Sequence, residues 1–148
     1  MKFSRNFSLE ELSFSKMAIK NGIPNNPGPV EKENLQNLVE NVLIPLQNKI
    51  EEPIVVASGY RTPELNCLEE GKKDSQHTKG EAVDIVVHSM PIKDLYDILC
   101  KEIEFDHAIL GHNKWIHVSY KKGQNRKQSF IEKRKYGKII FEPYQIHK

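Results

Sequence analysis

Two short segments of the chain, 82–86 and 115–120, constrain its fold more than any other feature. In each segment apolar residues alternate with polar ones, and the polar positions include Asp84 in the first and His117 in the second. Alternation with a period of two is typical of a strand that buries one face. Asp84 and His117 are therefore expected to face away from the core, and they can meet if the two strands are neighbours.

Helix signals dominate the first third of the chain, and strand signals are commonest after it. Ser8 and Glu11 form a capping box, which predicts a helix that ends at Gly22. Apolar residues at helical spacing over 35–46 predict a second helix, with a kink at Pro45. This order favours an α+β fold, with helices packed on a small, largely antiparallel sheet. We expect further strands at 54–58, 105–110 and 138–143, a short helix directly after Arg61, and a longer helix at 91–102.

Length and composition bound the class of protein. The 148 residues fit a single domain spanning 1–148, and we expect a monomer. No apolar run approaches the ~20 residues that cross a bilayer, and the start of the chain lacks the apolar stretch of a signal peptide. We therefore expect no membrane span and synthesis in the cytoplasm. A target in the cell wall would be reached by lysis or by another export route.

Charge and cysteine content exclude other classes. The net charge of +2 is too small to indicate nucleic-acid binding, and no recognition motif accompanies the basic residues that crowd the last third of the chain. These residues form either a solvated face or a contact for an anionic partner. Cys67 and Cys100 are too few for a disulfide framework, so both are interpreted as structural thiols.

Three residues carry the clearest chemical pattern, namely His77, Asp84 and His117. Two histidines and a carboxylate leave a fourth position on zinc open, as catalytic zinc sites require. Each residue alone could be a loop histidine, a surface acid or a sheet histidine. The spacing His-x-x-Gly-x-Ala-x-Asp, however, should arise by accident in roughly one chain in a thousand of this length. Gly80 and Ala82 would also allow the backbone to approach a metal or substrate closely.

Several blocks of sequence resemble the M15 zinc peptidases, which include D-alanyl-D-alanine carboxypeptidases and phage endolysins and share a fold with the Hedgehog signalling domain. The specific signals are Ser-x-His-x-x-Gly-x-Ala-x-Asp, beginning at Ser75, and Trp-x-His, beginning at Trp115. The likeness is to the compact, single-domain branch and reaches about residue 128. Weaker blocks that extend it are Phe7–Leu12, the Asn26–Pro27 turn, Ser58–Asn66 and Asn125–Arg126.

The resemblance implies a zinc metallopeptidase of the carboxypeptidase or endolysin type, which hydrolyses the stem peptides of bacterial peptidoglycan. It also implies that His77, Asp84 and His117 hold Zn²⁺ in a cleft over the sheet. Arg61 would bind substrate and stabilise the oxyanion, a role that fits the permanent charge and forked donors of a guanidinium. Ser75 and Gln76 would line the pocket or orient the first histidine.

One position departs from the family pattern. Relatives carry a glutamate shortly before the Trp-x-His block, where this chain has Gly111 or His112. His112 is one candidate for the catalytic base, because the unperturbed pKa of histidine lies near neutrality. It could equally be a loop histidine, and Asp106 and Glu81 are further candidates. The alternative function is a zinc-holding pseudo-peptidase that binds wall peptide or a protein partner without cutting it.

Overall fold

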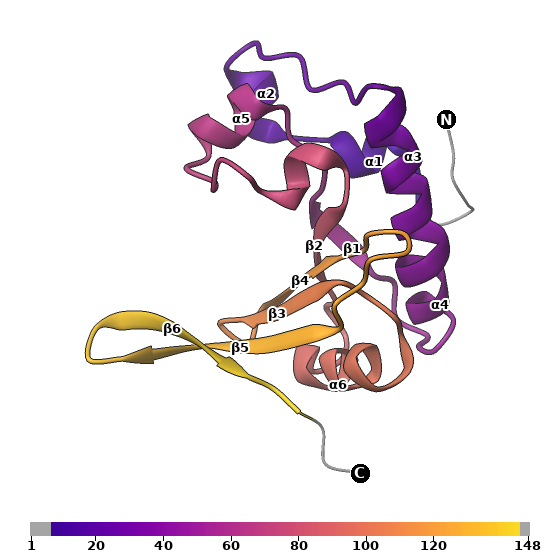
Figure 1. Cartoon of the computed structure of the whole chain (residues 1–148), viewed down its shortest axis with the longest axis vertical. Coiled ribbons are helices and arrows are strands. Elements are labelled where there is room, and N and C mark those ends of the chain that lie inside the picture. The colour runs from indigo at the N-terminus through magenta and orange to yellow at the C-terminus, as the bar shows by residue number, and fades with distance from the viewer. Residues whose placement is uncertain (1–6, 146–148) are drawn as a thin grey trace.

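A six-stranded sheet with the strand order β1-β2-β4-β3-β5-β6 forms the centre of the computed structural model, which describes residues 7–145 (Figure 1). Residues 1–6, which include most of the stretch examined for a signal peptide, and residues 146–148 lie outside the described range. The strands are β1 (Val55–Ser58), β2 (Ala82–Val86), β3 (His107–Gly111), β4 (Trp115–Ser119), β5 (Gln128–Lys135) and β6 (Lys138–Pro143). The helices are α1 (Leu9–Ser13), α2 (Lys16–Lys20), α3 (Pro29–Leu38), η1 (Val39–Leu43), α4 (Ile44–Gln47), α5 (Pro63–Leu68), η2 (Gln76–Lys79) and α6 (Ile92–Glu102).

The sheet is largely antiparallel, which confirms the predicted α+β class. Only β3 and β5 pair in parallel, while the other neighbouring strands run antiparallel. The segment expected as a final strand is β6, and it lies at one edge of the sheet. Strand β5 was not predicted. Together β5 and β6 form a long hairpin that projects beyond the rest of the sheet (Figure 1).

One face of the sheet supplies the core. Alternate residues of β2, β4 and β3 are buried, and they pack in a single cluster with the apolar stripes of α3, η1, α4 and α6. The opposite face of β2 and β4 carries Asp84 and His117, as the alternation predicted. The core residues of these strands are Val83, Ile85, Ala108, Leu110, Ile116 and Val118.

The first predicted helix is in fact two short helices, so the prediction of one continuous helix was wrong. The backbone of Phe14 is extended (φ −70°, ψ 133°), which ends α1. Ser15 then accepts a hydrogen bond from the amide of Ala18 and caps α2. A second capping serine therefore restarts the chain within a segment whose residues otherwise favour a helix. The predicted end is correct, because Gly22 follows α2 with a positive φ.

The predicted irregularity at Pro45 is present as a π-helical segment, Val39–Leu43, directly before the proline. Proline lacks an amide proton and its ring conflicts with the carbonyl four residues earlier, so the preceding turn widens. The longer helix α6 begins one residue after Pro91. Within residues 7–145, no helix combines the length and apolar character needed to cross a membrane.

Candidate metal centre

His77, Asp84 and His117 converge at one point although they come from three different elements. The Oδ1 atom of Asp84 lies 2.9 Å from Nδ1 of His117 and 3.4 Å from Nε2 of His77. The ligand atoms of the three side chains all lie within 4.8 Å of one another. The structure thus brings together the residues that the sequence predicted as metal ligands.

Strand pairing and a capped turn produce this convergence. Asp84 and His117 are direct cross-strand partners in the antiparallel pair β2–β4, so their side chains project from the same face. His77 belongs to the one-turn helix η2, whose N-cap Ser75 accepts a hydrogen bond from the His77 amide at 3.2 Å. The carbonyl of His77 accepts from the amide of Arg61, which ties η2 to the turn after β1.

The donor set fits a zinc ion. His77 Nδ1 lies 2.7 Å from the carbonyl oxygen of Gly59, so a proton on Nδ1 is bound there and Nε2 is left to face the other two ligands. Tetrahedral zinc with bonds of roughly 2.0 to 2.2 Å places its ligand atoms about 3.3 to 3.6 Å apart. The separations around Asp84 are close to this spacing. His77, Asp84 and His117 could therefore hold zinc with little rearrangement.

The electrostatics keep Asp84 ionised. Burial acts to raise the pKa of this carboxyl, but hydrogen bonds and charge from His117 and His77 outweigh burial and hold the pKa well below its usual range. An ionised carboxylate is the form that binds a metal. Asp84 therefore needs no deprotonation before it serves as a ligand.

Arg61 opens into the same cleft from the junction between β1 and α5. Its Nη2 lies 3.7 Å from Oδ2 of Asp84, and its Nε lies 3.1 Å from Oε2 of Glu69. Nη1 also donates to the side chain of Asn66, at 3.2 Å. The guanidinium is thus fixed beside the three ligands, in the place that the sequence predicted for it.

A second asparagine fixes the backbone on both sides of Arg61. The side chain of Asn25 donates to the carbonyl of Tyr60 at 2.9 Å and accepts from the amide of Thr62 at 2.9 Å. Thr62 also caps α5 by accepting from the amide of Leu65. These bonds fix the backbone on both sides of Arg61, so its long side chain has fewer positions available to it.

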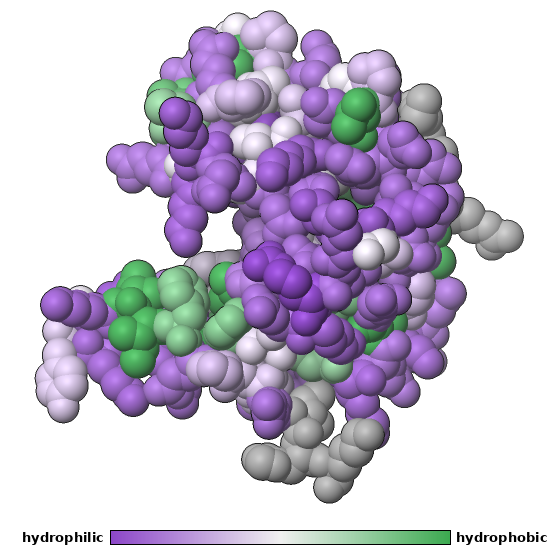
Figure 2. All heavy atoms as spheres, in the orientation of Figure 1, coloured by the Kyte–Doolittle hydropathy of each residue, from purple (hydrophilic) through white to green (hydrophobic). Residues whose placement is uncertain are grey.

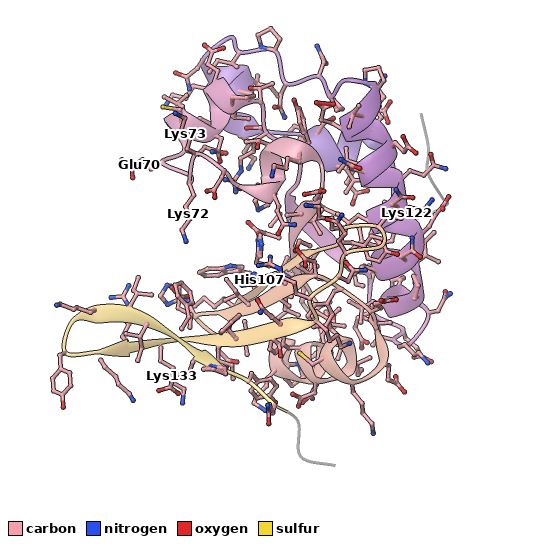
Figure 3. The ribbon with its side chains drawn as sticks, viewed as in Figure 1. Glu70, Lys72, Lys73, His107, Lys122 and Lys133 are labelled. Carbon is pink, nitrogen blue, oxygen red and sulfur yellow. The ribbon has the colours of Figure 1, made fainter. Side chains whose placement is uncertain are left out.

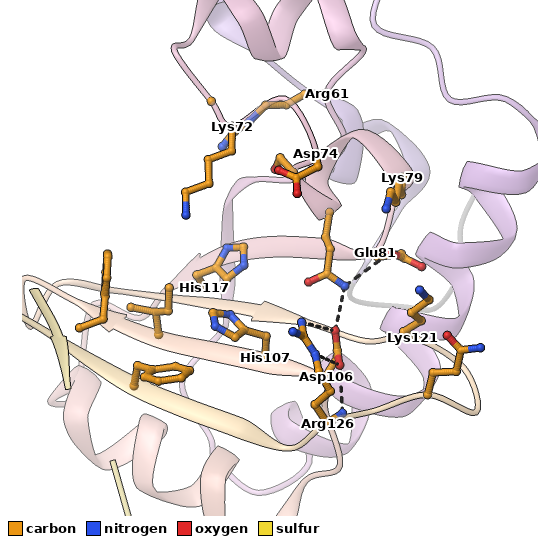
Figure 4. A pocket seen from close by; sticks show the side chains of 17 residues that line it. Arg61, Lys72, Asp74, Lys79, Glu81, Asp106, His107, His117, Lys121 and Arg126 are labelled. Carbon is orange, nitrogen blue, oxygen red and sulfur yellow. Dashed lines mark hydrogen bonds and ion pairs between the residues drawn. The ribbon is translucent and has the colours of Figure 1, made fainter. Parts of the chain in front are cut away.

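Gln76 lines the cleft and contacts two carboxylates. Its Nε2 donates to Asp106 at 3.0 Å and to Glu81 at 3.4 Å (Figure 4). Asp106 also accepts two hydrogen bonds from the side chain of Arg126, which hold its pKa down at about 2. The side chain of Asp106 is 2% exposed, and these partners occupy its oxygens. Asp106 is therefore a structural anchor for η2 and not a free proton acceptor.

The cleft over the site has a volume of about 850 Å³, which is within the range of ligand-binding pockets. The rings of His107 and His117 lie on its floor, and Lys72 reaches toward them from the loop between α5 and η2 (Figure 4). Space-filling atoms show a deep notch between this loop and the projecting hairpin (Figure 2). The site is thus open to a ligand that is larger than a single residue.

Comparison with known families identifies the chain. A model of the family Peptidase M15 matches residues 5–119, which is most of the sequence and includes all three converging residues. The chain belongs to the M15 peptidase family. Membership indicates a peptide-bond hydrolase, and M15 peptidases are typically zinc-dependent, in agreement with the His-Asp-His group. No curated protein matches the chain.

Gly111, one of the two positions at which the M15 glutamate was expected, is covered by an aromatic ring. A Cβ atom on this glycine would lie 2.2 Å from Cε2 of Trp115, its cross-strand partner. Real Cβ contacts are never this short, so a side chain at position 111 requires the indole to move. The indole of Trp115 therefore occupies the space that a side chain at position 111 would need.

The structure does not bring His112 to the metal ligands. The residue has a positive φ in the β3–β4 turn, and its ring packs on Trp115 with 5.0 Å between centroids. Its Nε2 lies 3.3 Å from Oε2 of Glu132 on β5. His112 is not among the side chains that line the cleft, so the geometry gives no support to its predicted role as a base.

His107 is a cleft residue that the sequence reasoning missed. Its ring centroid lies 6.1 Å from that of His117 and 5.2 Å from that of Phe130. Burial lowers the pKa of His107, and the charge of His117 acts in the same direction. Strand periodicity could have found this residue, because His107 is two and four positions before Ile109 and Gly111 on the open face of β3.

The small residues near Asp84 serve packing and not a metal. Gly80 has φ +74°, and a Cβ there would lie 2.4 Å from the carbonyl oxygen of Glu31 in α3. Glycine is therefore required by the turn and by the closeness of α3. Ala82 is fully buried. The expectation that Gly80 allows close approach to a metal or substrate is replaced by this contact with α3.

Proposed function

We propose that this M15 peptidase is a zinc enzyme that hydrolyses peptide bonds in the stem peptides of bacterial peptidoglycan. The observation that carries the proposal is the convergence of His77, Asp84 and His117 beside the guanidinium of Arg61, in a cleft large enough for a peptide. A bound zinc ion would supply a Lewis acid for the carbonyl and a water of lowered pKa. The substrate class is that of the carboxypeptidases and endolysins which the sequence resembles.

Arg61 has the geometry to bind the reacting carbonyl. Its Nη2 is close to Asp84, so a carbonyl beside the ligands would lie within reach of a charged donor. Hydrogen bonds to Ser58 and Asn66 hold the guanidinium in place before any substrate arrives. A donor that is fixed in advance stabilises developing negative charge without the cost of reorganisation.

Proton transfer must use another group than the family glutamate. Among the described side chains that line the cleft, Asp74, Glu81 and His107 are able to accept a proton, whereas Asp106 is occupied by Arg126 and Gln76. The backbone carbonyl of Glu81 accepts a hydrogen bond from the amide of Tyr120, and its carboxylate accepts a long one, at 3.4 Å, from Gln76.

A second candidate function is a zinc-holding pseudo-peptidase that binds wall peptide or a protein partner without cutting it. The specific observation in its favour is the indole of Trp115 over Gly111, which excludes a carboxylate from the position of the family base. Such a module would retain the metal ligands and Arg61 and would lose turnover.

Cleavage of a panel of stem peptides by the zinc-loaded protein, followed by mass spectrometry, tests the proposal. We predict slow but measurable hydrolysis, and we predict that Arg61→Ala lowers kcat/KM by about 10²- to 10³-fold, the usual loss on removing an oxyanion donor. Lys121→Ala, which removes a different cation of the cleft lining, is the control and should change kcat/KM less than about threefold.

The same assay distinguishes the alternatives. A parent protein that binds the peptides but cleaves none of them would establish the pseudo-peptidase. His112→Ala should leave cleavage unchanged, because its imidazole faces Glu132 and Trp115. A loss of about 10²-fold in that variant, with zinc content intact, would restore His112 as the base.

A further inference from the structure

The β5–β6 hairpin, residues 128–143, lies outside the part of the chain that the family model matches. It joins the sheet through the parallel pair β3–β5 and continues beyond it as a two-stranded ribbon (Figure 1). Isolated ribbons of this kind are only marginally stable unless one of their faces is covered. This hairpin, the arm, therefore has a face that the rest of the described chain does not cover.

The register of the arm separates its residues onto two faces. The back face carries Lys133 and Lys135, which form ion pairs with Glu142 at 3.2 and 2.9 Å. The front face carries Phe130, Glu132, Arg134, Ile139, Phe141 and Pro143, which follow from the cross-strand pairs.

The front face of the arm is continuous with the metal centre. Phe130 and Phe141 both line the cleft. His117 pairs with Ile109 on β3, and Ile109 pairs with Phe130 on β5, so one cross-strand row connects a metal ligand to the arm. Two strand spacings of about 4.8 Å place Phe130 roughly 10 Å from His117, which an extended peptide spans in about three residues.

The exposed part of this face includes two large apolar side chains, which adjoin the charged Arg134. Phe141 is 51% exposed and Ile139 is 48% exposed, and the space-filling view shows apolar residues side by side along the arm (Figure 2). Exposed apolar patches that adjoin a binding cleft commonly bind part of the ligand. Because the cleft leads onto this patch without a break, the ligand of the cleft is the occupant that the geometry favours.

The charges around the cleft limit which peptide can bind. Lys72 extends from the loop after α5 into the space above the arm (Figure 3), and Arg134 lies on the front face of the arm itself. The cleft lining holds more cations (Arg61, Lys72, Lys79, Lys121 and Arg126) than carboxylates (Asp74, Glu81 and Asp106), and Glu132 on the arm is in contact with His112. This excess of positive charge disfavours a basic peptide relative to a neutral or acidic one. The ligand must therefore combine an apolar side chain with neutral or negative charge.

We propose that the front face of the arm is a substrate subsite, formed by Phe141 and Ile139, which binds an apolar side chain of a neutral or acidic peptide three to five residues from the bond held at the metal centre. This subsite rests on the proposed function, since it assumes that the cleft takes a peptide. It would make the protein discriminate between long and short substrates, a property that the residues matched by the family model do not supply.

Binding of fluorescent peptides to the zinc-loaded full chain, measured by anisotropy, tests the subsite without requiring turnover. The probes are a three-residue and an eight-residue wall-type peptide, the longer with either leucine or serine at its distal positions. Phe141→Ser should weaken binding of the long leucine peptide about tenfold and leave the short peptide within twofold. Where cleavage is measurable, KM for the long peptide should rise while kcat stays unchanged.

Tyr136→Ser is the matched control, because Tyr136 is a fully exposed aromatic residue in the turn of the same arm and does not line the cleft. It should not change the binding of either peptide. Equal binding of the leucine and serine peptides, or an equal loss on both peptide lengths in Phe141→Ser, would overturn the subsite. So would a dimer in sedimentation velocity that Phe141→Ser dissociates, because the face would then bind a second copy. Length-dependent binding without any cleavage would contradict only the proposed hydrolysis.

Discussion

The metal centre and the β3–β4 turn are built in different ways. At the β2–η2 end, three ligand side chains converge, and each is fixed either by strand register or by a hydrogen bond such as that from His77 to Gly59. At the β3–β4 turn, Gly111 has no side chain and the indole of Trp115 lies across it. The first contains the His-Asp-His group, and the second has no carboxylate at position 111.

The metal ligands and the residues at the β3–β4 turn are positioned by different contacts of this fold. The ligands depend on backbone pairing between β2 and β4, which a surface substitution cannot easily change. A carboxylate at position 111 would depend on a single side chain, and the packed ring of Trp115 leaves no space for one there. Metal binding and peptide hydrolysis can therefore be tested separately in this chain.

Restoring the carboxylate should give the largest change. Gly111→Glu alone should destabilise the fold by about 1 to 3 kcal/mol, because its Cβ would collide with Trp115. Adding Trp115→Ala clears that space. We predict that the double variant hydrolyses a stem peptide about 10²- to 10⁴-fold faster than Trp115→Ala, the usual contribution of a general base.

The matched control is Gly111→Gln with Trp115→Ala, which has the same shape without a basic oxygen. If the glutamine variant hydrolyses the peptide as fast as the glutamate variant, a carboxylate at position 111 does not act as a base. Zinc content, measured in all variants, must stay constant for the comparison to hold.

A smaller effect, on the stability of the fold, should follow from changing Asp106, which anchors η2. The folded pKa of Asp106, about 2, lies below its usual value near 4, so its stabilising contribution is present above pH 4 and is lost as the pH falls from 4 toward 2. Asp106→Asn should lower the free energy of unfolding by roughly 2 kcal/mol at pH 7, and the deficit should shrink in that acid range. Urea unfolding at several pH values measures it.

Glu104→Gln is the control for this anchor, because Glu104 is an exposed carboxylate two residues away. This variant should have a free energy of unfolding within about 0.5 kcal/mol of that of the parent. A constant deficit for Asp106→Asn from pH 7 to pH 2 would show that the contacts to Arg126 and Gln76 do not depend on its ionisation.

The metal centre could be predicted from the sequence because its residues are positioned by signals between near neighbours in the chain. Alternation within 82–86 and 115–120 put Asp84 and His117 on an open face, and the structure pairs them directly. The position of Arg61 followed from a strand that ends just before a capped helix. Short-range periodicity and capping were sufficient for these elements.

The arrangement at the β3–β4 turn could not be predicted, because it depends on contacts between strands. Only the register of β3 against β4 shows that the indole of Trp115 lies over Gly111, and only tertiary contacts show that His112 turns toward Glu132. Strand β5 was missed because most of its residues are polar and several lie exposed in the arm, so it lacks the apolar alternation of a buried strand. The break between α1 and α2 was missed because Ser15, a second capping serine, lies within a segment that otherwise favours one helix.

Diffraction at the zinc absorption edge, from crystals of the zinc-loaded protein, tests whether His77, Asp84 and His117 hold a zinc ion. We predict one anomalous peak about 2.0 to 2.2 Å from Nε2 of His77, Oδ1 of Asp84 and Nδ1 of His117, with no peak there in Asp84→Ala. A peak bound by other residues, or full zinc occupancy in Asp84→Ala, would contradict it.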